Sequence, residues 1–161
     1  YEAVQLGYGK ANPKRLPKPL AGYFKQAGIE PVRFLREVRT DSAGELEVGQ
    51  KLGADLFQPG DRVHVVGNTK GRGFAGGMKR WGWHGGKATH GSTSHRRIGS
   101  VGAGTSPGRV LRGRNLPGQY GNERVMVRNL RVVKVEPDKG LLYIKGAVPG
   151  NRGSLLLVKK V

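Results

Sequence analysis

One segment of this chain, residues 67 to 122, cannot fold by burying its own side chains, and this constrains the fold of the whole. It contains 16 of the 28 glycines, both tryptophans and ten Lys or Arg, but neither Asp nor Glu. Its few large aliphatic side chains offer too little apolar surface to offset the conformational entropy lost on ordering. They are Met78, Ile98, Val101, Val110, Leu111 and Leu116. We therefore expect a partner to order this segment, and its uniform positive charge indicates a polyanionic partner.

The composition of the whole chain narrows the class of partner. Lys and Arg total 29 against 11 Asp and Glu, a net charge of +18 in 161 residues, which is enough chain for one ordinary domain. Such an excess favours nucleic acid. A membrane is the weaker choice because no apolar run approaches the roughly 20 residues of a spanning helix, and neither a basic amphipathic helix nor a signal peptide is evident. The lack of cysteine excludes a disulfide framework and suits the cytosol.

Hydrophobic alternation on both sides of the segment predicts a mainly β protein. Strands are expected over 3–6, 32–39 and 63–66 before it, and over 125–135, 141–148 and 154–161 after it. The 125–135 stretch is expected as one long strand or as two strands with a bulge. Short strands at this spacing favour an antiparallel sheet or a small β-barrel, closed or partly open. We predict a globular domain from residues 1–66 and 122–161, with residues 67–121 as an extended arm.

Residues 10–48 are expected as an insertion in the globular domain. The insertion begins with KANPKRLPKP, a basic and proline-rich run that is typical of a linker. A short helix over 19–27 would start at Pro19, end at Gly28, and place Leu20, Tyr23 and Phe24 on one face. The acidic run 40–50 is expected as a solvated turn followed by a short strand.

The sequence Gly71-Arg72-Gly73-Phe74-Ala75-Gly76 matches G-x-G-x-x-G and follows a predicted strand. A dinucleotide site would also need a long helix, a parallel strand and an acidic residue about 20 positions further on. No Asp or Glu occurs between Asp61 and Glu123. We interpret these glycines as positions where the backbone approaches phosphates closely or turns tightly beside them.

Aromatic and histidine side chains in the arm allow more than one interpretation. Trp81 and Trp83 would stack on unpaired RNA bases, or Trp81 would instead pack on the β domain at the root of the arm. His84, His90 and His95 have no Cys, Asp or Glu in the arm to complete a metal shell. The serines beside His95 likewise lack an acidic residue to orient the imidazole as a base. We therefore predict no metal site, no cofactor and no catalytic group.

Two basic clusters flank the glycine-rich turn 99–108: His95, Arg96 and Arg97 before it, and Arg109, Arg112 and Arg114 after it. This arrangement suggests an outgoing and a returning limb that follow phosphates, joined by an uncharged tip. The predicted RNA-binding residues are Lys70, Arg72, Lys79, Arg80, Trp83, His84, Lys87, His90, His95, Arg96, Arg97, Arg109, Arg112, Arg114 and Gln119. The predicted tip comprises Gly102, Ala103, Gly104, Thr105 and Ser106. In the isolated protein we expect this loop to be solvated.

Four collinear motifs identify a family: GNTKGRGFAGGMKRW, ATHGSTSHRRIGSVGAGTSPGRV, LPGQYGNERV and KGAVPGNRGSLLLVKK. They resemble the bacterial form of universal ribosomal protein three of the large subunit. The resemblance covers essentially the whole chain. It implies a β-barrel of the type shared with translation factors, and a long loop that enters large-subunit rRNA toward the peptidyl transferase centre. It also implies a cytoplasmic ribosome, an early role in subunit assembly, and neighbours that include large-subunit proteins fourteen and nineteen.

The chain departs from the family pattern in two places. Family members carry further residues ahead of the position of Tyr1, which form the first barrel strands, so we expect the sequence to be incomplete at its start. Some bacterial members carry a methylated glutamine at the position matching Thr105, and a threonine cannot carry that modification.

Together these patterns predict a structural rRNA-binding protein of the large ribosomal subunit that is not an enzyme and has neither a small-molecule substrate nor a membrane partner. The alternative is a free RNA chaperone or a nucleic-acid-compacting protein. That alternative shares the charge, but a sequence-general binder would not need one acid-free arm on a β domain.

Overall fold

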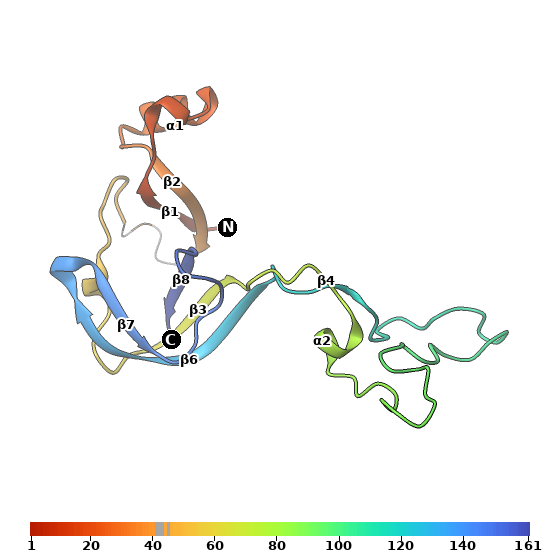
Figure 1. The fold of residues 1–161 in the computed structure, drawn as a ribbon. Helices are drawn as coiled ribbons and strands as arrows, with labels where there is room; N and C mark the ends of the chain where they lie inside the picture. The colour runs from red at the N-terminus through yellow and green to blue at the C-terminus, as the bar shows by residue number, and fades with distance from the viewer. Residues whose placement is uncertain (41–43, 45) are drawn as a thin grey trace. The chain divides into compact units, whose positions relative to one another are not determined.

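The structure is a computed structural model that describes residues 1–40, 44 and 46–161. The chain divides into two compact units, residues 1–53 and 54–161, and strands dominate both (Figure 1). The prediction of a mainly β fold with a short helix and a long loop is confirmed. In the part of the chain that the structure describes, no helix is long and apolar enough to cross a membrane.

The first unit is an antiparallel pair of strands that carries one helix. Strand β1 (Ala3–Lys10) pairs with β2 (Val32–Arg39), and a 3₁₀ turn, η1 (Pro13–Arg15), precedes the helix α1 (Lys18–Ala27). The predicted end of α1 is confirmed, because Gly28 caps it with a left-handed φ of 66°. The predicted start is wrong by one residue: Lys18 precedes Pro19 in the helix.

Helix α1 buries less of its apolar face than the pattern predicts. Phe24 is fully buried, whereas Leu20 and Tyr23 stay 41% and 45% exposed. The hydroxyl group of Tyr23 donates to Oε1 of Gln5 at 2.6 Å, which ties the helix to β1. Part of the acidic run 40–50 lies outside the described residues. In its described part, Gln50 N–H donates to the carbonyl oxygen of Glu47 at 3.1 Å, a turn where a strand was expected.

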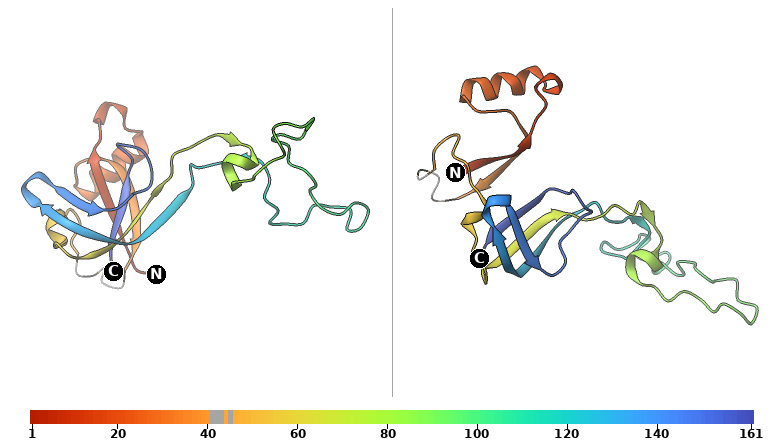
Figure 2. Two further views of the ribbon diagram at one scale, coloured as in Figure 1. Left: turned by 60° about the horizontal axis from the view of Figure 1, so that its bottom comes forward. Right: turned by 60° about the vertical axis from the view of Figure 1, so that its left-hand side comes forward.

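The second unit contains an open four-stranded antiparallel sheet in the order β7-β6-β3-β8 (Figure 2). After a 3₁₀ turn, η3 (Ala54–Leu56), the strands are β3 (Arg62–Asn68), β6 (Arg124–Glu136), β7 (Leu141–Lys145) and β8 (Leu156–Lys160). The turn η4 (Pro137–Lys139) joins β6 to β7. Of the two predicted architectures, closed or partly open, the described strands form the open one. The grouping of residues 1–66 with 122–161 as one domain stays a prediction.

Strand β6 is a single long strand with two register irregularities. One falls opposite Val63 and Val65 of β3, and the other lies between Val132 and Lys134 of β6 itself. At the first, Asn129 takes a left-handed φ of 57° and its backbone N–H donates to Nδ1 of His64 at 3.2 Å. Each irregularity shifts the strand by one residue and so decides which side chains share a face.

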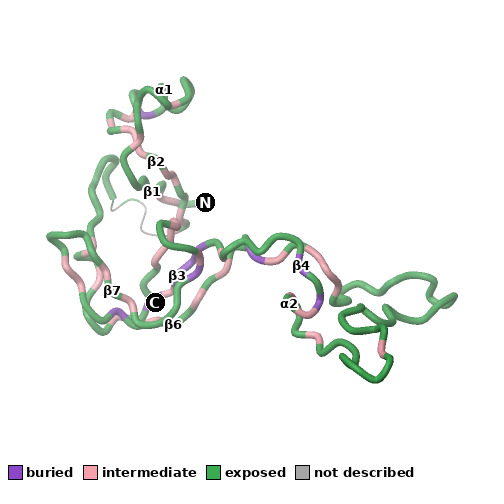
Figure 3. Tube along the Cα trace, in the orientation of Figure 1, coloured by how far each residue is buried: buried purple, intermediate pink, exposed green. Residues whose placement is uncertain are grey.

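The core of the sheet is a cluster of buried residues in β3 and β6, and buried positions are purple in Figure 3. Val63, Val65 and Val132 are completely buried there. Partly buried hydrophobic residues pack around them: Phe57, Leu130, Val135, Leu142, Ile144, Leu156 and Val158. The alternation predicted for β3 is confirmed for its two core valines.

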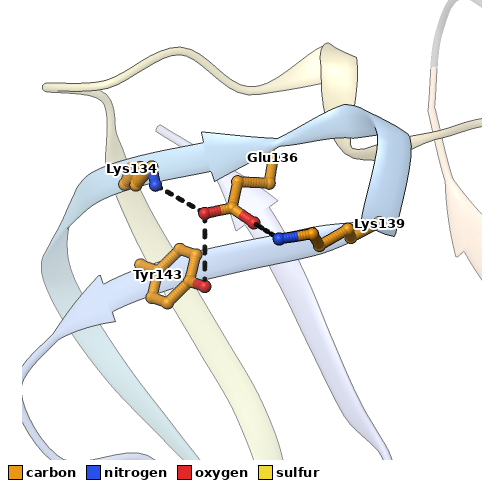
Figure 4. A network of polar contacts seen from close by, with 4 residues as sticks. All are labelled: Lys134, Glu136, Lys139 and Tyr143. Atoms are coloured by element: carbon orange, nitrogen blue, oxygen red, sulfur yellow. Dashed lines mark hydrogen bonds and ion pairs between the residues drawn. The ribbon is translucent and has the colours of Figure 1, made fainter.

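Two carboxylates fix the ends of the sheet strands. Glu136 accepts a hydrogen bond from Lys134 on Oε1, and Lys139 Nζ lies 3.1 Å from Oε2 (Figure 4). Asp61 Oδ2 accepts from Lys160 Nζ at 2.7 Å and from the backbone N–H of Gln58 at 2.9 Å. The lysine hydrogen bonds are the main reason that the pKa values of both carboxyl groups lie below their ordinary range.

Candidate nucleic-acid interface

The arm leaves the sheet as a paired ladder that continues β3 and β6. Beyond the last β3–β6 pair, Thr69 N–H donates to the carbonyl oxygen of Glu123 at 2.9 Å, and Arg72 N–H donates to that of Tyr120 at 2.8 Å. The ladder ends in β4 (Phe74–Ala75) and β5 (Gly118–Gln119). The outgoing and returning limbs therefore run antiparallel at their root (Figure 1).

The ladder depends on a glycine at one position. Gly121 has a left-handed φ of 71°, and a Cβ there would lie 2.0 Å from the carbonyl oxygen of Lys70. Only glycine fits both the backbone angle and the close approach of the other limb. The guanidinium of Arg72 also stacks 4.7 Å above the ring of Tyr120, which joins the two limbs through side chains.

A five-residue helix, α2 (Gly77–Trp81), locks the returning limb in place. Its last two side chains reach the same acceptor: Arg80 Nη1 and Trp81 Nε1 each donate to the carbonyl oxygen of Leu116 at 2.9 Å. The Arg80 guanidinium lies 4.8 Å from the centre of the Trp81 ring. Trp81 therefore lies near the root of the arm, and it contacts Leu116 of the returning limb.

Trp83 lies between two hollows formed by the limbs. Its ring rests on Gly77, where a Cβ would lie 1.9 Å from Cε3 of the indole. One hollow, about 480 Å³, is also lined by Ile98, Ser100, Val101, Gly113, Arg114, Asn115 and Leu116. The other, about 590 Å³, is lined by Gly85, Gly86, Ser94, Arg97, Ile98 and Gly99. An aromatic side chain, aliphatic neighbours and an arginine in the lining of each hollow suit an unstacked base.

The G-x-G-x-x-G segment does not lie in a dinucleotide fold. The strand before it, β3, has only antiparallel neighbours in the described sheet, and the helix after it has five residues. A Rossmann site needs a parallel sheet and a long helix at this point. Within the motif, Gly73 has a left-handed φ of 66°, which agrees with its interpretation as a tight turn.

The histidines and serines of the arm do not form a reactive group. Nδ1 of His95 donates to the carbonyl oxygen of Lys87 at 3.1 Å, and Ser92 Oγ accepts from the backbone N–H of Ser94 at 3.3 Å. His84 and His90 are both exposed. Among the residues that the structure describes, no group of three or more His, Cys, Asp or Glu could hold a metal ion.

The predicted RNA-binding residues lie almost entirely at the surface of the arm (Figure 3). Arg80 and Trp83 are half-buried, and the other thirteen are exposed. No cation of the arm has an acidic partner among the described residues, whose three ion pairs join residues of the sheet strands and of the turns beside them. Arg114 makes one internal contact, in which Nη2 donates to the carbonyl oxygen of Ser100 at 3.2 Å. The arm therefore presents free positive charge.

The predicted tip is exposed throughout, from Gly102 to Ser106. A short turn shapes it, because Gly108 N–H donates to the carbonyl oxygen of Gly104 at 3.1 Å. Two contributors to the interface were missed in the sequence. Tyr120 could have been noticed as an aromatic residue in a basic segment, but nothing in a sequence marks the backbone carbonyl of Leu116 as an acceptor.

The fold and the arm define a class: small β proteins that carry a long, acid-free cationic extension. The chain belongs to the ribosomal protein L3 family, whose model matches residues 38–141. It is 54% identical over 159 residues to the large ribosomal subunit protein uL3 of Thermotoga petrophila. The match covers 99% of this chain and 76% of that protein. The uL3 proteins of Pelotomaculum thermopropionicum and Desulforudis audaxviator are 54% and 55% identical, over 99% of this chain and 76% and 74% of theirs. These matches confirm the predicted family.

Proposed function

We propose that this protein is a structural constituent of the large ribosomal subunit in the cytoplasm, and that residues 67–121 bind large-subunit rRNA. One observation carries the proposal: the arm exposes cations that have no acidic partner among the described residues, on a backbone that is hydrogen-bonded at its root. Phosphate groups would supply the missing negative charge and release counterions from the RNA. Membership of a ribosomal protein family supports this assignment, and no step of it calls for a catalytic group.

The arm would work by charge neutralisation and shape. The clusters around Arg96 and Arg112 follow phosphates along the two limbs, while Trp83 offers a stacking surface for a base. The tip from Gly102 to Ser106 has small, uncharged side chains and so enters a narrow space between RNA elements. The family resemblance directs this tip toward the peptidyl transferase centre.

The β-rich segments 1–66 and 122–161 would act as one body on the rRNA surface, with residues 10–48 as its insertion. The family resemblance adds an early role in subunit assembly. It also proposes large-subunit proteins fourteen and nineteen as neighbours. These assignments depend on the family, whereas the proposal for the arm depends also on its own charge and exposure.

Sedimentation of tagged protein with ribosomal particles tests the proposal. The tagged wild-type protein should remain on large subunits after a high-salt wash. Arg96→Gln/Arg97→Gln should lower its occupancy, because both arginines are exposed and unpaired in the arm. The matched control, Lys18→Gln/Lys25→Gln, removes two exposed charges from helix α1 and should leave occupancy near the wild-type level. Wild-type protein found only in the free fraction would instead support a free RNA chaperone.

A further inference from the structure

Three cations form a row across the outer face of the four-stranded sheet. Arg62 of β3 lies directly opposite Arg131 of β6, and Arg131 lies directly opposite Lys145 of β7. All three are exposed. They alternate with the core: Val63, next to Arg62, pairs with Leu130, and both pack on the apolar face. We call Arg62, Arg131 and Lys145 the sheet row.

The register places the sheet row where like charges repel most. Directly opposed side chains on neighbouring strands have Cβ atoms about 4.5–5.5 Å apart, and like charges in such pairs destabilise a sheet. Arg131 has a cation on both sides. The structure thus carries an electrostatic cost that three neutral polar residues would remove.

The acids of the sheet do not relieve this cost. Glu136 pairs with Lys134 and Lys139, and Asp61 pairs with Lys160 (Figure 4 shows the first group). In the described chain these are all the ion pairs, and none includes a residue of the sheet row. Carboxylates therefore neutralise Lys134, Lys139 and Lys160, whereas the sheet row has no counter-charge among the described residues.

We propose that the sheet row binds the phosphate backbone of RNA, as a second contact separate from the arm. The proposal rests on the proposed function, because the same rRNA supplies both contacts. Strands lie about 4.8 Å apart, so the three cations form a line about 10 Å long, a length over which one strand of a duplex carries about three phosphates. Arg62 lies six residues before Asn68, where the paired ladder of the arm begins, or about 20 Å along β3.

Continuity of charge favours RNA over an acidic protein segment. On the same face, Lys159 of β8 lies opposite His64 of β3. The exposed Lys159 extends the positive surface to the fourth strand. A surface that spans four strands follows an extended polyanion better than a short acidic motif. Strands β3 and β6 also continue directly into the arm, so RNA held by the arm lies within reach of the row's own strands (Figure 2).

The test compares two double variants of the full chain that remove the same charge from the same unit. Arg62→Gln/Arg131→Gln removes two cations of the row, whereas Lys139→Gln/Lys160→Gln removes two lysines that are ion-paired. Binding to an RNA duplex of roughly 20 base pairs is measured as a function of salt, and thermal unfolding of the free proteins is measured by circular dichroism.

The row variant should unfold at a higher temperature than wild type and bind RNA with a slope of log K against log salt that is shallower by about 2. The control should unfold at a lower temperature and change the slope by less than about 1. An equal slope change in both variants, or none in the row variant, overturns the inference. So does competition by polyglutamate as strong as that by RNA. A wild-type slope that is already shallow refutes the proposed function instead.

Discussion

Replacing Gly77 with alanine should push the indole of Trp83 out of its position between the two hollows. The new methyl carbon would lie 1.9, 2.1 and 2.2 Å from three atoms of the ring. Carbon atoms in favourable contact are about 3.5–4.0 Å apart, so the ring must move by about 1.5–2 Å. Insertion of an extra methyl group into a packed contact costs about 1–3 kcal/mol. If RNA binding must restore the wild-type arrangement of the arm, this free energy lowers the affinity for RNA about 5- to 150-fold.

Nuclear magnetic resonance distinguishes the two indoles without a further mutation. In Gly77→Ala, the Nε1–H signal of Trp83 should shift, while that of Trp81 stays near its wild-type position because its bond to the carbonyl oxygen of Leu116 is intact. The matched control is Gly22→Ala in helix α1, outside the arm, since a Cβ at Gly22 meets nothing within 4 Å. An unchanged Trp83 signal together with wild-type RNA affinity would refute the packing argument.

Three further outcomes are expected. Trp81→Phe removes one hydrogen bond to the carbonyl oxygen of Leu116, worth about 0.5–1.5 kcal/mol. RNA binding in a gel-shift assay should therefore weaken by no more than about 13-fold, and a larger loss would mean that Trp81 touches RNA directly. Val132→Ala opens a cavity in the sheet core and should lower the free energy of unfolding in urea by about 2–3 kcal/mol, whereas a loss below about 0.5 kcal/mol would place Val132 outside the core. Lysine partners lower the pKa values of Asp61 and Glu136, so both carboxylates should stabilise the fold above their ordinary pKa values, 3.8 and 4.5, and lose that contribution as the pH falls through the lower folded-state values. In Asp61→Asn/Glu136→Gln, the free energy of unfolding should therefore fall less steeply at acid pH, and an unchanged pH dependence would show that neither pair contributes.

Sequence reasoning succeeded where a local pattern determines the local structure. Alternation predicted β3, since Val63 and Val65 must face the core. Proline and glycine predicted the position of α1 to within one residue, because a left-handed cap at Gly28 ends a helix. The short strand expected within 40–50 rested on composition, and the described part of that run is a turn.

Long-range contacts set the limit of such reasoning. Helix α2 is five residues long and begins at Gly77, a poor helix former, and two of its side chains bind a carbonyl oxygen 35 and 36 residues away. The sheet row was missed for a related reason. Its register depends on the two irregularities of β6, and a shift of one residue moves Arg131 to the opposite face. Neither contact has a local sequence pattern.

The central claim is that the arm binds rRNA through its ten cations. Its most direct test is the salt dependence of full-length protein binding to a large-subunit rRNA fragment. If the ten Lys and Arg of the arm meet phosphates, the slope of log K against log salt should lie between about −7 and −9. A slope shallower than about −3 would contradict the claim.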